Sequence, residues 1–378
     1  MITTIKSQKE VRAFALKNLS EAPNVTYSVP VLLMVLLAAA TNGHSIYSKA
    51  QAPDADTIFY RIDTTIRKLE NDFWKQGLDF LVTNRKRLDK KKCYIVVDET
   101  YDSYTGKLLR KEKKAKHKLT EKEKEALKYL HKYKPKKGDT GSYKYLVFAV
   151  VYGKQRHVLL VKALKRKEHY KNFIIKMLLE LRCELKYCCA IFDRGFYDGD
   201  FVQNLKTNRI PFIVRARISK TMKTIYGFYS RWKRYTDFVV GKSVGTCDLI
   251  LGTEMRQGKR MKWAFVTNLQ VKHLSEIRAI YKKRWNIENI FKATDGIQLR
   301  PQTSNPTTRM FCVCLSFLFY NEWQEKKNIT PTTLLDFMVD KIEKLFNTIL
   351  QKMKKAIEFY RDRLKIKIPF WTRIISSI

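Results

Sequence analysis

The spacing of apolar residues divides the chain into two helical end regions and a central region of strands and helices. Apolar residues recur at helical spacing in residues 58–80, and residues 29–40 are apolar nearly all round, as in a buried helix. From residue 93 the period changes to short β-branched runs that alternate with helical segments. We expect strands at 93–97, 142–152, 157–163, 187–192 and 211–218, and helices at 167–181 and 198–206.

The rest of the chain adds insertions and more helices to this pattern. Residues 105–141 are dense in Lys and predict a solvated, partly helical insertion, whereas residues 219–270 alternate polar and apolar positions and predict a β-rich one. Helices are expected at 273–292, 309–320 and 332–364. The sequence therefore predicts an α/β fold with a mixed sheet flanked by helices, divided into a helical basic region (1–92), an α/β domain (93–300) and a helical C-terminal region (301–378).

Charge is the most unusual feature of the composition. The 378 residues include 75 Lys plus Arg against 36 Asp plus Glu, for a formal net charge of +39, and basic residues recur along the whole chain. Hydrophobic residues make up 45% and aromatic residues 12% of the sequence, which predicts a folded protein. A folded protein this cationic is expected to act on a polyanion, and we expect the helical region 1–92 to bind DNA.

Several other functional classes find little support. The longest apolar run, residues 29–40, is too short to span a bilayer, so we expect a cytoplasmic, nucleoid-associated protein and no membrane partner. The seven cysteines include no C-x-x-C pair of the kind that binds zinc. There is no Walker-type phosphate loop and no G-x-S-x-G turn, so we expect neither a nucleotide cofactor nor a serine hydrolase.

Two of the expected strands are followed by an aspartate. Asp98 follows the apolar run 95–97, and Asp193 follows the run 190–192. The carboxyl ends of strands are where α/β sheets place their sites, although a single Asp in such a position is usually only a turn former. Glu99 and Asp102, beside the first aspartate, are candidates for acids that support a metal site from behind its ligands, but we expect exposed loop acids instead.

The helix expected at 273–292 carries a third carboxylate. Tyr281, Arg284, Glu288 and Lys292 fall within an arc of roughly 80° along the edge of its apolar stripe. One interpretation is a solvated face with ion pairs at four-residue spacing, each worth a few tenths of a kcal/mol. The other is a metal site, because crowded carboxylates repel one another and a divalent cation relieves that repulsion. Oxygen ligands alone favour Mg²⁺ or Mn²⁺.

These segments resemble the DDE transposases of bacterial and archaeal insertion sequences, which have a ribonuclease H-like core. The resemblance is carried by residues 96–100 (VVDET), by residues 193–197 (DRGFY) with 210–212 (IPF) beyond them, and by residues 281–292. The last segment is identified with the Y-(2)-R-(3)-E-(6)-K signature of that group. Its matching residues are taken as Tyr281, Arg284, Glu288 and Lys292.

The resemblance implies a set of roles. Two Mg²⁺ or Mn²⁺ ions would be held by the carboxylates of Asp98, Asp193 and Glu288. Phosphates of the transposon end would be contacted by Tyr281, Arg284 and Lys292. In some members a tryptophan of the β-insertion stacks on a flipped base, for which the candidates are Trp232 and Trp263, although an ordinary packing role is the alternative for each. The implied partners are double-stranded DNA, at terminal inverted repeats and target sites, and a second copy of the chain.

The function that follows is a DNA transposase that cleaves and joins strands at the ends of an insertion sequence. Two alternatives stay open. One is a nuclease of ribonuclease H-like fold that does not transpose, and the other is a catalytically inactive, domesticated DNA-binding protein. The Lys-rich insertion 105–141 is a candidate phosphate-contacting arm in any of these.

Overall fold

A single mixed sheet organises the computed structural model of the protein. The structure describes residues 11, 13–19, 32, 36, 60–114, 119–220, 222–226, 232–240, 246–299, 301, 303–326, 333–334, 336–344, 347, 351 and 355. In these residues the strands are β1 (Cys93–Tyr104), β2 (Leu130–His131), β3 (Gly141–Tyr152), β4 (Gln155–Leu164), β5 (Cys189–Phe192), β6 (Phe212–Arg215), β7 (Lys233–Val239), β8 (Thr246–Arg256) and β9 (Lys259–Thr267). Their order is β2-β3-β1-β5-β6-β9-β8-β7, and β4 also pairs with β3.

The strands run in both directions, as the predicted mixed sheet requires. β1 pairs antiparallel with β3 and β3 antiparallel with β4, whereas β5 pairs parallel with both β1 and β6. Five strands thus run in the order β4-β3-β1-β5-β6, antiparallel on one side of β1 and parallel on the other. The α/β fold with a mixed sheet flanked by helices is confirmed.

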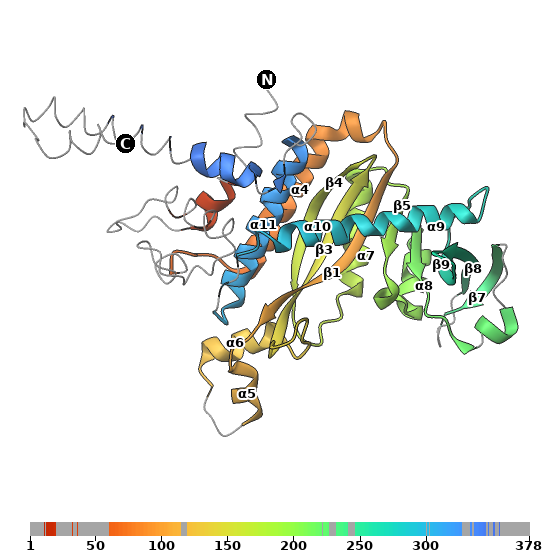
Figure 1. Ribbon diagram of the computed structural model, residues 1–378, viewed down its shortest axis with the longest axis horizontal. Helices are drawn as coiled ribbons and strands as arrows, with labels where there is room; N and C mark the ends of the chain where they lie inside the picture. The colour runs from red at the N-terminus through yellow and green to blue at the C-terminus, as the bar shows by residue number, and fades with distance from the viewer. Residues whose placement is uncertain are drawn as a thin grey trace, which may run out of the picture.

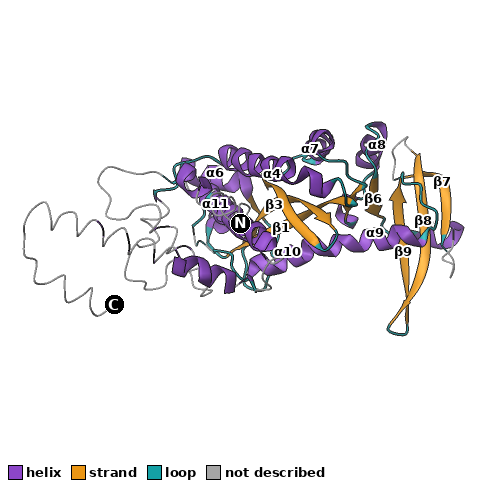
Figure 2. Ribbon diagram, turned by 90° about the horizontal axis from the view of Figure 1, so that it is seen from above, coloured by secondary structure: helices purple, strands orange, loops and turns teal. Residues whose placement is uncertain are grey.

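Helices cover both faces of this sheet (Figures 1 and 2). The described helices are α4 (Ile66–Leu88), α5 (Leu108–Lys113), α6 (Glu121–Tyr129), α7 (Lys171–Glu184), α8 (Gly199–Thr207), α9 (Ser275–Tyr281), α10 (Trp285–Asp295) and α11 (Pro306–Lys326). Figure 2 shows α7 and α8 on one face and α9 and α10 on the other. The sheet therefore separates two apolar clusters, one beneath α7 and α8 and one beneath α9, α10 and α11.

Strand β1 is longer than the sequence predicts. We expected it to end at Asp98, but it continues to Tyr104 because β3 pairs with it along its whole length, as far as Gly141. Only its pairing with β5 stops at Val97. Asp98 is thus inside a strand, at the point where one of its two neighbours ends.

Both predicted insertions contain the expected kinds of structure. The Lys-rich one contains α5 and α6, and Thr120 and Glu123 form a capping box at the start of α6. The β-rich one contains β7, β8 and β9, and β9 pairs antiparallel with β6. This second insertion extends the central sheet, since its last strand lies directly beside the fifth strand of the core.

The terminal regions are described only in part. α4 begins at Ile66, after the N-cap Thr65, and crosses β4 closely at Gly77, where a Cβ would lie 2.3 Å from the Leu159 carbonyl oxygen. Of the helix expected at 29–40, only Leu32 and Leu36 belong to the described residues, and both are buried. Most of the helix expected at 332–364 lies outside them. Within the described part of the chain, no helix combines the length and apolar character needed to cross a bilayer.

Candidate active site

The register of two parallel strands places Asp98 and Asp193 side by side. Val97 and Phe192 are the last residues paired between β1 and β5, and the two aspartates follow directly. Val96 belongs to the apolar cluster beneath α9–α11, so the alternation of side chains along β1 points Asp98 to the same face. The sequence predicted an aspartate after each apolar run, and the pairing of β1 with β5 places the two side by side.

A long helical segment brings the third carboxylate over that face. α9 and α10 are joined by a 3₁₀ turn at residues 282–284, so the backbone stays helical from Ser275 to Asp295. Its apolar stripe is buried against the sheet, with Ile287 and Ile290 at 0% exposure. The polar edge of the helix therefore faces the strand ends. There the Tyr281 hydroxyl donates a hydrogen bond to Asp193 Oδ1 at 3.1 Å.

One guanidinium group contacts all three carboxylates. Arg284 Nη1 donates to Asp98 Oδ2 at 3.1 Å, and Arg284 Nη2 donates to Glu288 Oε1. Arg284 Nε lies 3.9 Å from Asp193 Oδ1. The structure thus brings Asp98, Asp193 and Glu288 together around a single cation, although they are separated by up to 190 residues in the sequence.

The electrostatics of this cluster reflect burial and close charges. Burial raises the pKa of Asp98 to about 6, opposed by a backbone hydrogen bond from Glu99 and by the charge of Arg284. Burial also raises the pKa of the Tyr281 hydroxyl. For Arg284, burial alone would lower the pKa, but the neighbouring phenol and aspartates outweigh it and raise the pKa above its usual range. The guanidinium is therefore a permanent cation.

The carboxylate oxygens of the cluster suit a hard divalent cation, but in this structure they surround the guanidinium of Arg284. Three carboxylates without histidine or cysteine are typical of Mg²⁺ or Mn²⁺ sites. In the part of the chain that the structure describes, however, no three acidic, His or Cys side chains are close enough together to hold a metal ion. Arg284 lies among the carboxylate oxygens of Asp98, Asp193 and Glu288.

Lys292 lies apart from this cluster. It is exposed and lines a cleft of about 820 Å³ between β1, α10 and α11. Lys292 follows Glu288 after three residues, and the position after six residues is held by Asp295, which is paired with Lys136 at 3.6 Å. The lysine of the family signature is therefore not matched at its spacing. A contact between Lys292 and a DNA phosphate stays a prediction, and it would have to form in this cleft.

The two candidate tryptophans are packed against other rings. Trp232 and Trp263 both stack on Phe265, with ring centroids 6.2 and 5.9 Å away. Trp263 also lies 6.4 Å from the ring of Tyr281, and the guanidinium of Arg215 lies 5.0 Å from its centroid. Both side chains thus have packing roles in this structure, and stacking on a DNA base stays a prediction.

The acids beside Asp98 were expected to be exposed, and that prediction is wrong. Glu99 forms an ion pair with Lys144 at 2.6 Å, and Asp102 is 5% exposed and paired with Arg309 of α11. Both lie on β1, whose extension past Asp98 puts them beside other elements. They are structural residues that hold the strand in place.

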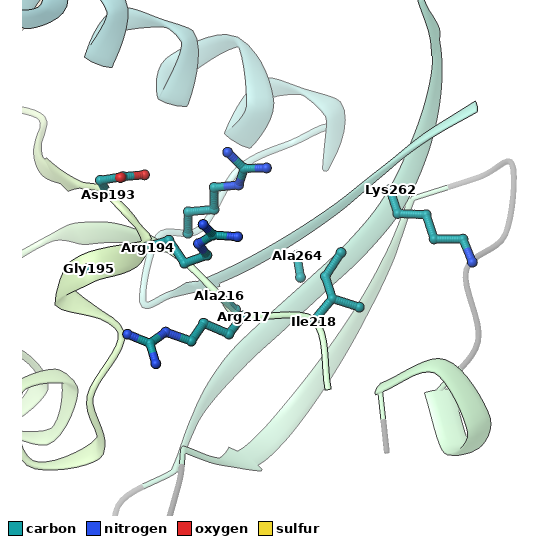
Figure 3. A pocket seen from close by; sticks show the side chains of 9 residues that line it. Asp193, Arg194, Gly195, Ala216, Arg217, Ile218, Lys262 and Ala264 are labelled. Carbon is teal, nitrogen blue, oxygen red and sulfur yellow. The ribbon is translucent and has the colours of Figure 1, made fainter. Parts of the chain in front are cut away.

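A basic cleft next to Asp193 was missed by sequence reasoning. It measures about 640 Å³ and is lined by Asp193 and by four cationic residues, Arg194, Arg215, Arg217 and Lys262. Figure 3 shows Asp193, Arg194 and Arg217 on one side of this cleft and Lys262 on the other. The only signal in the sequence is that one arginine follows Asp193 directly and two more stand at alternate positions at the end of β6.

Together, the strand order and the position of the three acids define a transposase-type ribonuclease H-like fold. A family model described as "Transposase DDE domain" matches residues 89–300, more than half of the chain. The chain belongs to this family, and it is a DDE transposase.

Comparison with other proteins gives a consistent but more distant result. No curated protein sequence matches the chain. Among solved structures, the piggyBac transposase, determined as a synaptic complex with hairpin DNA, is similar with a TM-score of 0.52. The two proteins share 10% sequence identity, and the similarity covers 97% of this chain and 84% of that one. This likeness establishes a shared fold.

Proposed function

We propose that this transposase cleaves DNA at the ends of an insertion sequence and joins the freed ends to a target, in a metal-dependent reaction. The observation that carries the proposal is that Asp98, Asp193 and Glu288 surround one guanidinium, that of Arg284, beside a basic cleft. That they come from two neighbouring strands and one helix means that the fold, not chance proximity on a surface, positions them.

In the proposed reaction the carboxylates of Asp98, Asp193 and Glu288 would hold two Mg²⁺ or Mn²⁺ ions. Such ions activate a water or a 3′-hydroxyl group and stabilise the leaving oxygen of a phosphodiester. Tyr281 orients Asp193 through its hydroxyl group. The helix carries Glu288 on a rigid element, which fixes the third ligand relative to the sheet.

Electrostatics support DNA as the partner. Some arginines elsewhere in the structure have an acidic partner, as Arg234 has in Asp248 and Arg309 in Asp102. Arg194 and Arg217 line the basic cleft and form no ion pair with any described residue. The cleft holds four cationic residues and one acid, so a phosphate backbone in it would be stabilised by the excess positive charge.

The test is cleavage and joining of a duplex that carries the DNA flanking this reading frame, including any terminal inverted repeats. We expect nicks at the element's end in Mg²⁺ and products joined to target DNA. Asp98→Asn, Asp193→Asn and Glu288→Gln should each abolish both reactions while binding to the duplex remains measurable. Full activity in any one of these variants would refute the assignment of that carboxylate.

A matched control is available on the opposite face of the sheet. Glu180 on α7 makes only a weak pair with Lys176 at 3.8 Å, so Glu180→Gln should leave cleavage unchanged. Cleavage without joined products would indicate a nuclease that does not transpose.

We also propose that the protein acts as a homodimer on DNA, because cutting and joining two ends requires two active sites held together. Sedimentation of the DNA complex should give two subunits for each pair of ends. One subunit for each pair would contradict this.

A further inference from the structure

Arg284 is bound so deeply in the carboxylate cluster that it is not accessible to DNA in this structure. The residue is 8% exposed, and its guanidinium contacts Asp98, Asp193 and Glu288 and lies 5.8 Å from the ring centroid of Tyr281. A signature arginine that contacts phosphate would instead point toward the surface. Its observed position calls for a role of its own.

The guanidinium and a divalent cation would compete for the same oxygen atoms. Arg284 Nη1 approaches Asp98 Oδ2 and Nη2 approaches Glu288 Oε1, each by direct hydrogen bonds. A metal ion shared by the three carboxylates needs lone pairs that face the middle of the cluster, which is where the guanidinium donates. The two kinds of cation therefore exclude each other.

The bound position of Arg284 is imperfect, so a better partner can displace it. Its Nε is buried and has no hydrogen-bond acceptor, since Asp193 Oδ1 is 3.9 Å away. A buried donor without an acceptor costs free energy, which weakens the hold of the cluster on this side chain. A phosphate group offers the guanidinium two parallel, charge-assisted hydrogen bonds, which is the geometry that arginine binds best.

We propose that Arg284 is an internal counter-cation that closes the carboxylate site to divalent metal ions until a DNA phosphate takes up its guanidinium. This inference rests on the proposed function of the three carboxylates. Its consequence is that metal loading and DNA binding are coupled: DNA raises the affinity for metal, and metal raises the affinity for DNA by the same factor. The free protein would then keep its carboxylate site closed to metal ions until it binds DNA.

The direct test measures Mn²⁺ binding to the full-length protein in the absence of DNA. Electron paramagnetic resonance quantifies the Mn²⁺ that remains free. Arg284→Gln removes the cation and should raise Mn²⁺ affinity by roughly 5- to 150-fold, the usual range of coupling between two sites. Arg284→Lys keeps the charge but cannot bridge three carboxylates, so it should also bind Mn²⁺ more tightly than the wild type. If Arg284→Lys bound Mn²⁺ as tightly as Arg284→Gln, the positive charge would have no part in closing the site, and the proposal would be overturned.

A matched arginine on the same helical segment serves as the control. Arg278 is paired with Glu254, outside the carboxylate cluster. Arg278→Gln removes the same charge at a distance and should leave Mn²⁺ affinity unchanged. Circular dichroism of each variant establishes that it is folded before binding is measured.

The second half of the test adds a DNA duplex that carries the DNA flanking the reading frame. It should raise Mn²⁺ affinity of the wild type but not of Arg284→Gln, in which the site is already open. Equal Mn²⁺ affinity of wild type and Arg284→Gln, with loss of binding in Glu288→Gln, would refute the gate while leaving the metal site intact. Binding that Glu288→Gln does not reduce would overturn both the gate and the proposed metal site.

Discussion

The basic cleft beside Asp193 gives a quantitative prediction for DNA binding. Arg194 and Arg217 are exposed in this cleft and have no acidic partner among the described residues. Each arginine that neutralises one phosphate of duplex DNA contributes about 0.9 to the slope of log K against log salt concentration. Replacing both by alanine should therefore make the slope shallower by about 1.8.

The same relation gives the loss of affinity. If the electrostatic contribution vanishes near 1 M salt, each contact is worth about eightfold at 0.1 M, so the double variant Arg194→Ala/Arg217→Ala should bind about 60-fold more weakly there. Fluorescence anisotropy of a labelled duplex between 0.05 and about 0.3 M salt measures both quantities. The affinities of the two proteins should converge as salt rises.

The control is Lys154, an exposed cation in the turn between β3 and β4, at the end of the sheet opposite Asp98. Lys154→Ala should leave the slope unchanged. An unchanged slope in the double arginine variant, or an equal change in Lys154→Ala, would show that the cleft is not the path of the DNA.

Three further predictions concern stability. Arg309→Met should destabilise the fold by about 3–5 kcal/mol in urea denaturation, because it removes the cation that pairs with the buried carboxylate of Asp102 (5% exposed); a loss below about 1 kcal/mol would contradict this. Gly77→Ala should cost about 1–3 kcal/mol in the same assay, since its Cβ would lie 2.3 Å from the Leu159 carbonyl oxygen, and a neutral effect would mean that α4 and β4 separate easily. Burial lowers the pKa of His157 from 6.5 to about 3, so the unfolded chain binds a proton that the folded one does not, and stability present above pH 6.5 is lost as the pH falls. At pH 5 that loss is about 2 kcal/mol relative to pH 7, and it should be absent in His157→Gln.

The parts of the site that depend on local patterns could be predicted from the sequence. Two apolar runs that each end in an aspartate indicate two buried strands with a carboxylate at the end, and residues 281–288 indicate a helix whose polar edge carries the third carboxylate. These patterns suffice because strand alternation and helical periodicity fix the direction of side chains before any tertiary contact forms. The structure places Asp98, Asp193 and Glu288 around one guanidinium, as those directions require.

The parts that depend on contacts between distant segments could not be predicted. The end of β1 is set by its partner β3, which holds the strand in place for six residues past Asp98. The burial of Asp102 follows from Arg309, which lies 207 residues away. The basic cleft is assembled from the loop after β5, the end of β6 and the middle of β9, none of which is basic enough alone to mark a site.

The position of Arg284 shows a further limit of sequence reasoning. Helical spacing correctly placed it on the edge that carries Glu288, but spacing gives no information on whether a long side chain turns outward to a ligand or inward to a carboxylate. The inward direction follows from the buried carboxylate of Asp98, which needs a counter-charge, and from Glu288 and Asp193, which lie beside it.

The central claim is that Asp98, Asp193 and Glu288 together bind the metal ions that act on DNA. The most direct measurement replaces Mg²⁺ by Fe²⁺ in the DNA complex and maps where hydroxyl radicals, generated at the bound ion, cut the polypeptide. We expect cuts next to all three residues, at positions far apart in the sequence but adjacent in the fold, and their joint loss in Glu288→Gln. Cuts confined to other segments, or cuts that persist unchanged in that variant, would contradict the claim.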